Sequence, residues 1–407
     1  MSEMRCFDIV VVGGGMIGSA LALGLSQQGW QVGMVETSVR DAVMASPEPA
    51  DGVSAFEPRV SAISAASQTL LDTLGVWSSV EAGRHCPYRK MTVWDGDGTG
   101  RISFDAAELH APALGTIVEN RHIVRALFGA LENSAVEVID GASVAAFSQE
   151  GEVRRLTLAD GTLLESALVI AADGAQSRLR QWVGLPTREW DYGQEAIVCT
   201  VRTAQSHRFT AWQRFSPTGP LAFLPMLSES GDDHYCSIVW SQDTVEARRL
   251  MALDDARFCA ELETAIEREL GSVVAISRRF SFPLRQRHAK DYVAPGVVLV
   301  GDAAHTIHPL AGQGANLGYS DVRVLLQELL RARKAGLQPD EALVLARYQR
   351  RRKADNLAMM AAMEGFKQLF ARDELPLRWL RNAGMRWLNE LGPVKHRIAA
   401  EAMGLNH

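Results

Sequence analysis

The first forty residues carry apolar runs in the order strand, helix, strand. The stretch 7–12 is apolar and rich in β-branched residues, which predicts a buried strand. Apolar residues at helical spacing between 19 and 28 predict a helix. The stretch 31–35 predicts a second strand, which ends before Glu36. Together these elements predict a complete βαβ unit.

Three glycines stand between the first predicted strand and the helix. Gly13 permits a tight turn, Gly15 lets the backbone approach a pyrophosphate, and Gly18 lets the helix pack closely on the strand. Glu36 follows where a carboxylate accepts hydrogen bonds from an adenosine ribose. Glycine clusters also form ordinary turns, but this register of elements favours a dinucleotide site. Glu36 favours FAD or NAD over NADP, because a carboxylate accepts from the free 2′-hydroxyl of the adenosine ribose but repels a 2′-phosphate.

Two later apolar stretches also end in carboxylates. The predicted strand 167–172 runs into Asp173, and the predicted strand 297–300 runs into Gly301 and Asp302. Ligands bind beyond the carboxyl ends of strands in open α/β sheets. An NAD site needs neither segment, whereas the ribityl hydroxyls of FAD suit an aspartate such as Asp302. The alternative for the segment at Gly301 and Asp302 is a plain link between a strand and a helix, in which the aspartate has no ligand.

A helix is predicted from 320 to 335, and the segment before it is rich in glycine. Gly312 and Gly314 let the backbone come close to a flat ring. The backbone amides that open this helix favour negative charge at the N1/C2 edge of a flavin. The amides concerned belong to Gly314, Ala315, Asn316 and Leu317.

Between 179 and 285 the pattern changes to short strands separated by turn residues, which predicts a mostly antiparallel sheet over the flavin. Trp212 and Phe223 are candidates for an apolar wall of the substrate pocket, and plain sheet core is the alternative. Helices are predicted near the C-terminus, where 346–407 holds 12 Lys+Arg against 6 Asp+Glu. That excess suggests contact with a membrane surface or a partner, with packing on the protein's own core as the alternative.

Composition limits the partners and the compartment. The chain has 42 Lys+Arg against 48 Asp+Glu, a net charge of −6, which argues against nucleic acid as a partner. No apolar run is long enough to predict a transmembrane helix. The five cysteines show no CxxC pair, which suits a reducing cytoplasm.

These stretches resemble the FAD-dependent aromatic hydroxylases of the para-hydroxybenzoate hydroxylase type. The resemblance extends to the ubiquinone-biosynthesis ring hydroxylases through Arg-Val-Ser-Ala-Ile-Ser at 59–64, Val-Glu-Asn at 118–120 and the long run at 301–314. It covers nearly the whole chain. The chain departs from many relatives at Ala315, where they carry Val, a change too small to affect flavin binding.

The resemblance implies a monooxygenase. In this family NAD(P)H delivers two electrons, the reduced flavin reacts with O2, and a C4a-hydroperoxide transfers one oxygen atom to an activated ring. No catalytic side chain or metal is expected, since the flavin carries the chemistry. His305 and His308 have the spacing of a metal pair, but no HExxH or third ligand accompanies them.

By resemblance, several residues outside the glycine motif also contact the cofactor or the pocket. Arg59 is expected against the flavin or its pyrophosphate, with a surface ion pair as the alternative. Asn120 and Arg125 are expected against the FAD phosphates. Pro309 is expected to shape the pocket at the flavin face, and His308 is a further pocket candidate.

The expected fold is α/β: a Rossmann-like FAD-binding domain with an inserted, mostly antiparallel substrate sheet and a C-terminal helical region. The expected division gives FAD binding to 1–75, 106–180 and 286–345, substrate-domain strands to 76–105 and 181–285, and C-terminal helices to 346–407.

The expected function is ring hydroxylation of a hydrophobic polyprenyl phenol in ubiquinone biosynthesis. The region 363–370 resembles the branch that hydroxylates ring position five. Other small aromatic substrates, halogenation, prenyl-chain reduction and a non-catalytic FAD-binding subunit are the alternatives. A cytoplasmic protein is expected, with peripheral membrane contact or a multi-enzyme assembly as further options, and the oligomeric state is left open.

Overall fold

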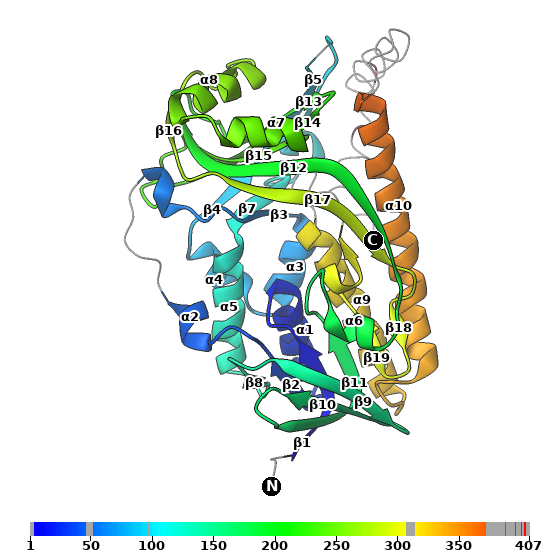
Figure 1. The fold of residues 1–407 in the computed structure, drawn as a ribbon. Helices are drawn as coiled ribbons and strands as arrows, with labels where there is room; N and C mark the ends of the chain where they lie inside the picture. Colours follow the sequence, from blue (N-terminus) through cyan, green and yellow to red (C-terminus); the bar gives the residue numbers. More distant parts are fainter. Residues whose placement is uncertain are drawn as a thin grey trace.

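The computed structural model describes residues 4–45, 52–96, 98–306 and 314–371, and the single residues Trp387, Lys395, Ala400 and Met403. In Figure 1 a sheet built around parallel strands fills the lower half, a large antiparallel sheet fills the upper half, and a small sheet lies between them. The expected fold class, an α/β domain with an inserted antiparallel sheet, is confirmed. The expected domain boundaries stay a prediction.

The first sheet has a parallel core in which β1 is flanked by β11 and β2. Its order is β18 (Val293–Ala294), β19 (Val297–Leu299), β11 (Leu163–Ala171), β1 (Met4–Val12), β2 (Val32–Val35) and β8 (Glu137–Ile139), and β10 (Val153–Leu158) and β9 (Val144–Glu150) extend it from β11. β1 and β11 end in unbroken apolar runs that are fully buried, as expected for strands covered on both faces.

The second sheet is antiparallel except where β13 pairs with β5. Its order is β20 (His305–Thr306), β17 (Phe280–Ala289), β12 (Thr187–Thr203), β15 (Tyr235–Asp243), β14 (Gly219–Met226), β13 (Thr210–Ser216), β5 (Lys90–Asp95) and β6 (Arg101–Asp105), and β16 (Val273–Ile276) pairs with β12. The small sheet has the order β3 (Val60–Ile63), β7 (Gly115–Glu119) and β4 (His85–Tyr88).

Helices cover the parallel sheet and one face of the antiparallel sheet. They are α1 (Met16–Gln27), α2 (Arg40–Met44), α3 (Ala65–Thr73), α4 (Trp77–Glu81), α5 (Asn120–Glu132), α6 (Arg178–Trp182), α7 (Thr244–Met251), α8 (Asp255–Ala265), α9 (Gly314–Lys334) and α10 (Ala342–Ala371). Short 3-10 helices are η1 (Gly52–Ala55), η2 (Ala106–Leu109) and η3 (Gly301–Ala303). None of the described helices has both the length and the apolar content that a membrane span requires.

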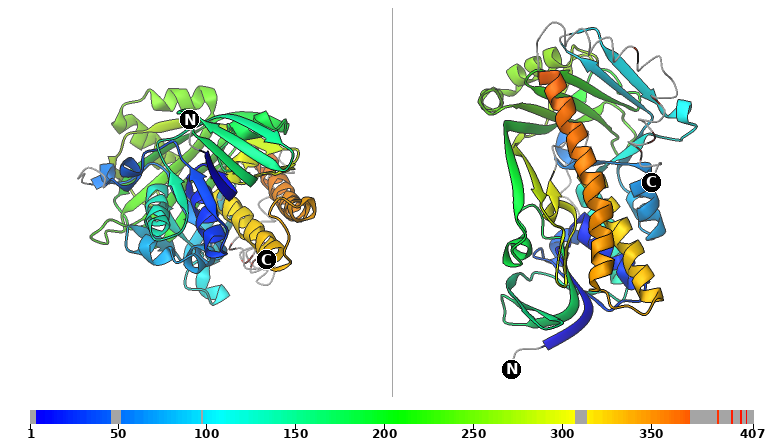
Figure 2. Two further views of the ribbon diagram at one scale, coloured as in Figure 1. Left: turned by 90° about the horizontal axis from the view of Figure 1, so that it is seen from below. Right: turned by 90° about the vertical axis from the view of Figure 1, so that its right-hand side faces the viewer.

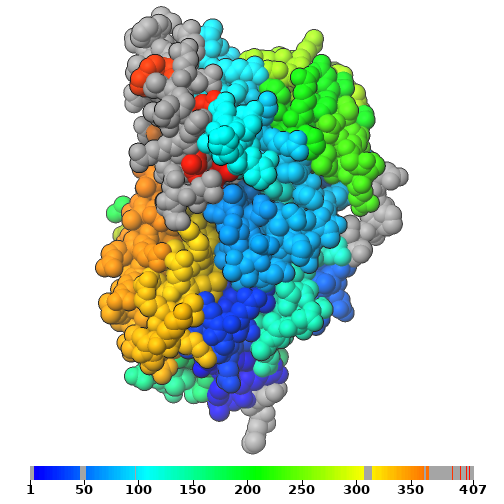
Figure 3. Space-filling view, turned by 180° about the vertical axis from the view of Figure 1, so that it is seen from behind, coloured from blue at the N-terminus to red at the C-terminus, as the bar shows by residue number. Residues whose placement is uncertain are grey.

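The long helix α10 runs along the side of the molecule past both large sheets (Figures 1 and 2). It packs on α9 over much of its length and also contacts β18 and β13, which belong to different sheets. Figure 3 shows the yellow α9 and the orange α10 side by side on one face, next to the blue α1. Beyond Ala371 the predicted C-terminal helices lie outside the described residues except for single positions, of which Trp387 is exposed.

Two cores lie on opposite faces of the antiparallel sheet, because side chains alternate along each strand. On the outer face Trp212 and Phe223 pack with Trp240 against α7 and α8. The structure therefore places both pocket candidates in sheet core, on the face turned away from β3. Leu224, the neighbour of Phe223, lies on the opposite face, in the core shared with the small sheet.

The substitution Phe223→Ala should therefore act on folding. The ring is 0% exposed, and its loss leaves a cavity that costs about 3–5 kcal/mol of unfolding free energy. Urea unfolding measures this change, with Val245→Ala at an exposed position of α7 as the control. A raised KM for the aromatic substrate with unchanged unfolding would instead place Phe223 at the pocket.

Candidate functional site

The carboxyl ends of four strands, β2, β1, β11 and β19, meet at one edge of the first sheet. The residue after each end donates its backbone N–H to the last residue of the neighbouring strand, at 2.8 to 3.0 Å: Gly13 to Val35, Ala172 to Val12 and Val300 to Ala171. This register brings the glycine turn, Glu36, Asp173 and Asp302 to the same edge. Three segments that are far apart in the chain thus converge here.

The glycines of the turn differ in what surrounds them. Gly13 has a φ of +109°, and a Cβ there would lie 2.3 Å from the carbonyl oxygen of Ala172. A Cβ at Gly18 would lie 1.8 Å from the Gly13 carbonyl oxygen, so the fold itself requires both glycines. A Cβ at Gly15 would meet nothing within 4 Å. Gly15 therefore keeps open space above the start of α1, whose first turn has no side-chain cap or acidic residue.

Glu36 lies directly beside the glycine turn. Its Oε2 accepts the Gly14 N–H at 2.5 Å, and its Oε1 accepts the Ser38 N–H at 2.7 Å. The carboxylate therefore lies against the turn, and its remaining lone pairs can accept from a ribose hydroxyl.

Asp173 has one oxygen engaged and one without a partner. Its Oδ2 accepts the backbone N–H groups of Arg178 and Leu179 at 2.9 and 3.3 Å, which caps the start of α6. Its Oδ1 is buried and has no hydrogen-bond partner among the described residues. Buried polar atoms are nearly always hydrogen-bonded, so this oxygen suits a donor from a bound group.

Asp302 lies on η3 and is exposed to solvent, although much of the protein surrounds its carboxyl group. Desolvation by this surrounding protein raises the pKa of the Asp302 carboxyl, and the nearby charges of His305 and Arg59 oppose the rise. Arg59 stands just before β3, with its guanidinium carbon 5.6 Å from the ring centre of Phe282 on β17. It forms no ion pair within the described ranges, so the surface ion pair considered for it is not seen.

Asn120 and Arg125 both lie on α5 but not on the same face. The Asn120 N–H donates to the Arg59 carbonyl at 3.0 Å, and its Oδ1 accepts from Ser61 Oγ at 2.7 Å. Five residues advance a helix by about 140° beyond a full turn, so Arg125 faces a different direction. The structure therefore brings Asn120 against the segment that carries Arg59, and the phosphate contact expected for Arg125 stays a prediction.

The start of α9 is tied to β3 and α3 by the side chain of Asn316. Its Oδ1 accepts the Ser64 N–H at 3.0 Å and the Ser67 hydroxyl at 2.8 Å. Its Nδ2 donates to the Ala62 carbonyl at 2.8 Å. The side chain is thus fully engaged within the protein, which leaves the backbone amides of Gly314 to Leu317 for a ligand. His308 and Pro309 lie outside the described residues.

Sequence reasoning missed a buried charge cluster beneath η3. Asp321 of α9 is 0% exposed and pairs with His305 and with Arg352 of α10. Because His305 Nε2 lies 2.6 Å from Asp321, that ring nitrogen is not directed at a metal. The signal in the sequence was Asp321 itself, since the apolar Leu317 and Leu325 lie one turn before and after it on the same helix face.

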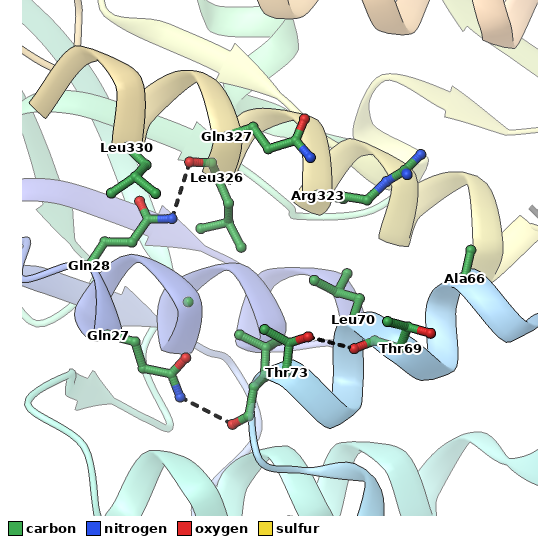
Figure 4. A pocket seen from close by; sticks show the side chains of 12 residues that line it. Gln27, Gln28, Ala66, Thr69, Leu70, Thr73, Arg323, Leu326, Gln327 and Leu330 are labelled. Carbon is green, nitrogen blue, oxygen red and sulfur yellow. Dashed lines mark hydrogen bonds between the residues drawn. The ribbon is translucent and has the colours of Figure 1, made fainter. Parts of the chain in front are cut away.

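A separate hollow of about 530 Å³ lies between α1, α3 and α9, with a mostly apolar floor (Figure 4). At its rim Gln28 Nε2 donates to the Leu326 carbonyl and Gln27 Nε2 to the Leu74 carbonyl, both at 3.1 Å. Its α1 and α9 residues begin at Gly24 and Arg323, more than two turns from the helix starts at the strand ends. The hollow is therefore distinct from the strand-end site.

Comparison with known proteins agrees with this geometry. The family model described as "FAD binding domain" matches residues 6–362. The chain is 41% identical over 401 residues to the 3-demethoxyubiquinol 3-hydroxylase of Escherichia coli (strain K12), covering 98% of both chains. It is 36% identical to the ubiquinone hydroxylase UbiL of Rhodospirillum rubrum, covering 99% of this chain and 91% of that one.

Among solved structures, the p-nitrophenol 4-monooxygenase of Pseudomonas putida superposes with a TM-score of 0.78 over 98% of both chains, at 21% identity. At that identity the likeness shows the fold alone. The family model and the relatives above 30% identity show the family. The chain belongs to the FAD-dependent aromatic hydroxylases, alongside the ubiquinone-biosynthesis ring hydroxylases, and is an FAD-dependent aromatic-ring monooxygenase.

Proposed function

We propose that this protein hydroxylates the ring of a polyprenylated phenol or quinol in ubiquinone biosynthesis, at the carbon numbered 3 in 3-demethoxyubiquinol. The convergence of the strand ends with Glu36, Asp173 and Asp302 supports a single flavin site. The 41% identity over 98% of the chain supports the substrate class and the ring position. Ring position five, the preference drawn from 363–370, stays the alternative; most side chains of that region lie outside the described residues.

The residues at the strand ends fit FAD, and we assign Glu36, the glycine turn and Asp302 a part in holding it. Glu36 would accept from the adenosine ribose, the turn with Gly15 would take the pyrophosphate, and Asp302 would hold the ribityl hydroxyls. Arg59 and Asn120 would lie along the phosphates, and the α9 amides along the flavin ring. Bound FAD supplies the electrons from NAD(P)H and the activation of O2.

The substrate wall is proposed on the inner face of the antiparallel sheet. Val198, Val239 and Phe282 share this face, since Val198 pairs with Val239 and Phe282 pairs with Ala196 two residues away. All three are half-buried, unlike the fully buried Phe223. Apolar side chains that are only partly covered leave room for a phenol ring beside them. Once the ring is bound, they exclude water from it.

We also propose peripheral contact of the C-terminal region with the membrane. The excess of 12 Lys+Arg over 6 Asp+Glu in 346–407 favours anionic lipid, and Trp387 is 63% exposed. Beyond α10, Lys395 Nζ lies 2.8 Å from Glu108, and the Met403 carbonyl accepts the Ala66 N–H at 3.2 Å.

The glycine turn provides a test of the cofactor site. Gly15→Ala should leave the unfolding free energy of the apoprotein within about 0.5 kcal/mol, because its Cβ meets no protein atom. It should weaken FAD binding about tenfold by crowding the pyrophosphate. Gly18→Ala, the matched control, should destabilise the fold by about 1–3 kcal/mol or more through its clash with Gly13. Wild-type FAD affinity in Gly15→Ala would contradict the assignment.

Ring position is tested by complementation of three ubiquinone-deficient strains, each blocked at a different ring hydroxylation. The chain should restore ubiquinone in the strain that accumulates 3-demethoxyubiquinol, with quinone intermediates identified by mass. The purified yellow protein should also oxidise NAD(P)H and release less peroxide when that quinol is present. Rescue of a different block alone would reassign the ring position, and rescue of none would contradict the function.

Membrane contact is tested by co-sedimentation with phosphatidylcholine vesicles that contain or lack phosphatidylglycerol. The full chain should sediment with the anionic vesicles, and Trp387→Ala should reduce the bound fraction while leaving the Lys395 and Met403 contacts in place. A chain ending at Arg372 should bind least. Equal sedimentation of all three proteins would remove the proposal.

A further inference from the structure

The buried carboxylate of Asp321 accepts hydrogen bonds from three different elements. Its Oδ2 accepts the Gly301 N–H at 2.9 Å and lies 2.6 Å from His305 Nε2. Its Oδ1 accepts from Arg352 Nε at 2.7 Å. Asp321 therefore ties α9, η3, β20 and α10 together at one point. The first of these partners, Gly301, is the residue directly before Asp302.

Arg352 is the link from α10 to this carboxylate. Its side chain is 2% exposed, and its NH2 group also donates to Asn356 Oδ1 at 2.8 Å and to the Leu317 carbonyl at 3.4 Å. The same guanidinium thus touches both the anchor of η3 and the first turn of α9. Those two segments are the ones proposed to meet the ribityl chain and the flavin ring.

The charge balance of this cluster depends on Arg352. Burial would raise the pKa of Asp321, but the charges of His305 and Arg352 and their hydrogen bonds lower it. The carboxylate therefore stays ionised in a site with no exposure to water. Removing one partner of such a buried pair leaves an uncompensated charge, which forces the surrounding groups to shift.

The turn held by Asp321 begins at a glycine in the left-handed backbone region. Gly301 has a φ of +56°, and a Cβ there would lie 3.4 Å from Ile17 of α1, in ordinary contact. Its N–H group donates to Asp321, so a movement of that carboxylate moves the Val300–Gly301 peptide, one residue before Asp302. The position of the Asp302 carboxyl is thus linked, through Asp321, to Arg352 of α10, which lies outside the strand-end site.

We propose that Arg352 is a positioning residue for the flavin, which acts through Asp321 on the Gly301–Asp302 turn and on the first turn of α9. The inference rests on the flavin site proposed above. It makes cofactor affinity depend on the docking of α10, the helix that packs beside α9 and contacts both large sheets (Figures 2 and 3). A purely structural ion pair would contribute to folding alone.

The test compares FAD affinity with apoprotein stability. FAD binding to the apoprotein is measured by flavin fluorescence, and unfolding of the apoprotein by urea. Arg352→Met should weaken FAD binding about tenfold or more, a loss of about 1.4 kcal/mol per factor of ten. Arg352→Lys keeps the positive charge and should recover most of the affinity. If Arg352→Met does not fold, Arg352→Gln, which keeps a hydrogen-bond donor but not the charge, provides the measurement of the loss.

Arg154→Met is the matched control, since it also breaks a buried ion pair. Arg154 NH1 lies 2.7 Å from Asp340, and a Cβ at Gly296, before the start of β19, would collide with its guanidinium. This pair therefore lies at the opposite end of β19 from Gly301. Arg154→Met should lower the stability of the apoprotein but leave FAD affinity within about twofold.

Two results would overturn the positioning role of Arg352. One is unchanged FAD affinity together with lowered stability in Arg352→Met, or in Arg352→Gln if Arg352→Met does not fold. The other is an equal loss of FAD affinity in Arg154→Met. Absence of FAD binding by the unaltered chain would overturn the flavin site itself, so the two failures are distinguishable.

Discussion

The structure depends on the register of its parallel strands. The backbone hydrogen bonds from Gly13 to Val35 and from Ala172 to Val12 align the carboxyl ends of β1, β2 and β11. The bond from Val300 to Ala171 aligns the end of β19 with them. Side chains that follow these ends must then share one edge, however far apart they lie in the sequence. The glycine turn, Glu36, Asp173 and Asp302 form a single site for this reason.

Elements outside the parallel sheet complete the site by reaching the same edge. Asn316 joins α9 to β3 and α3 through three hydrogen bonds, and the carbonyl of Arg59, before β3, accepts the N–H of Asn120 on α5. The antiparallel sheet then lies across from this edge, with Phe282 of β17 beside Arg59. A flavin held by the strand ends would thus face a sheet whose inner side carries apolar, half-covered residues.

Much of this arrangement was readable in the sequence, because glycine and carboxylate positions at strand ends follow directly from backbone geometry. The direction of the pocket aromatics was not. A single strand shows which residues alternate, but only packing decides that Phe223 faces α7 and α8 while Leu224 faces the small sheet. The Asp321–Arg352 pair was also missed, since its partners lie on two helices whose contact is tertiary.

The central claim is that one dinucleotide spans the aligned strand ends. A crystal structure of the protein with FAD tests it most directly. The account predicts the adenosine ribose at Glu36, the pyrophosphate at the turn of Gly13 to Gly18, and the ribityl chain at Asp302. FAD bound with Glu36 and Asp302 on separate surfaces, or with its ribityl chain away from Asp302, would contradict it.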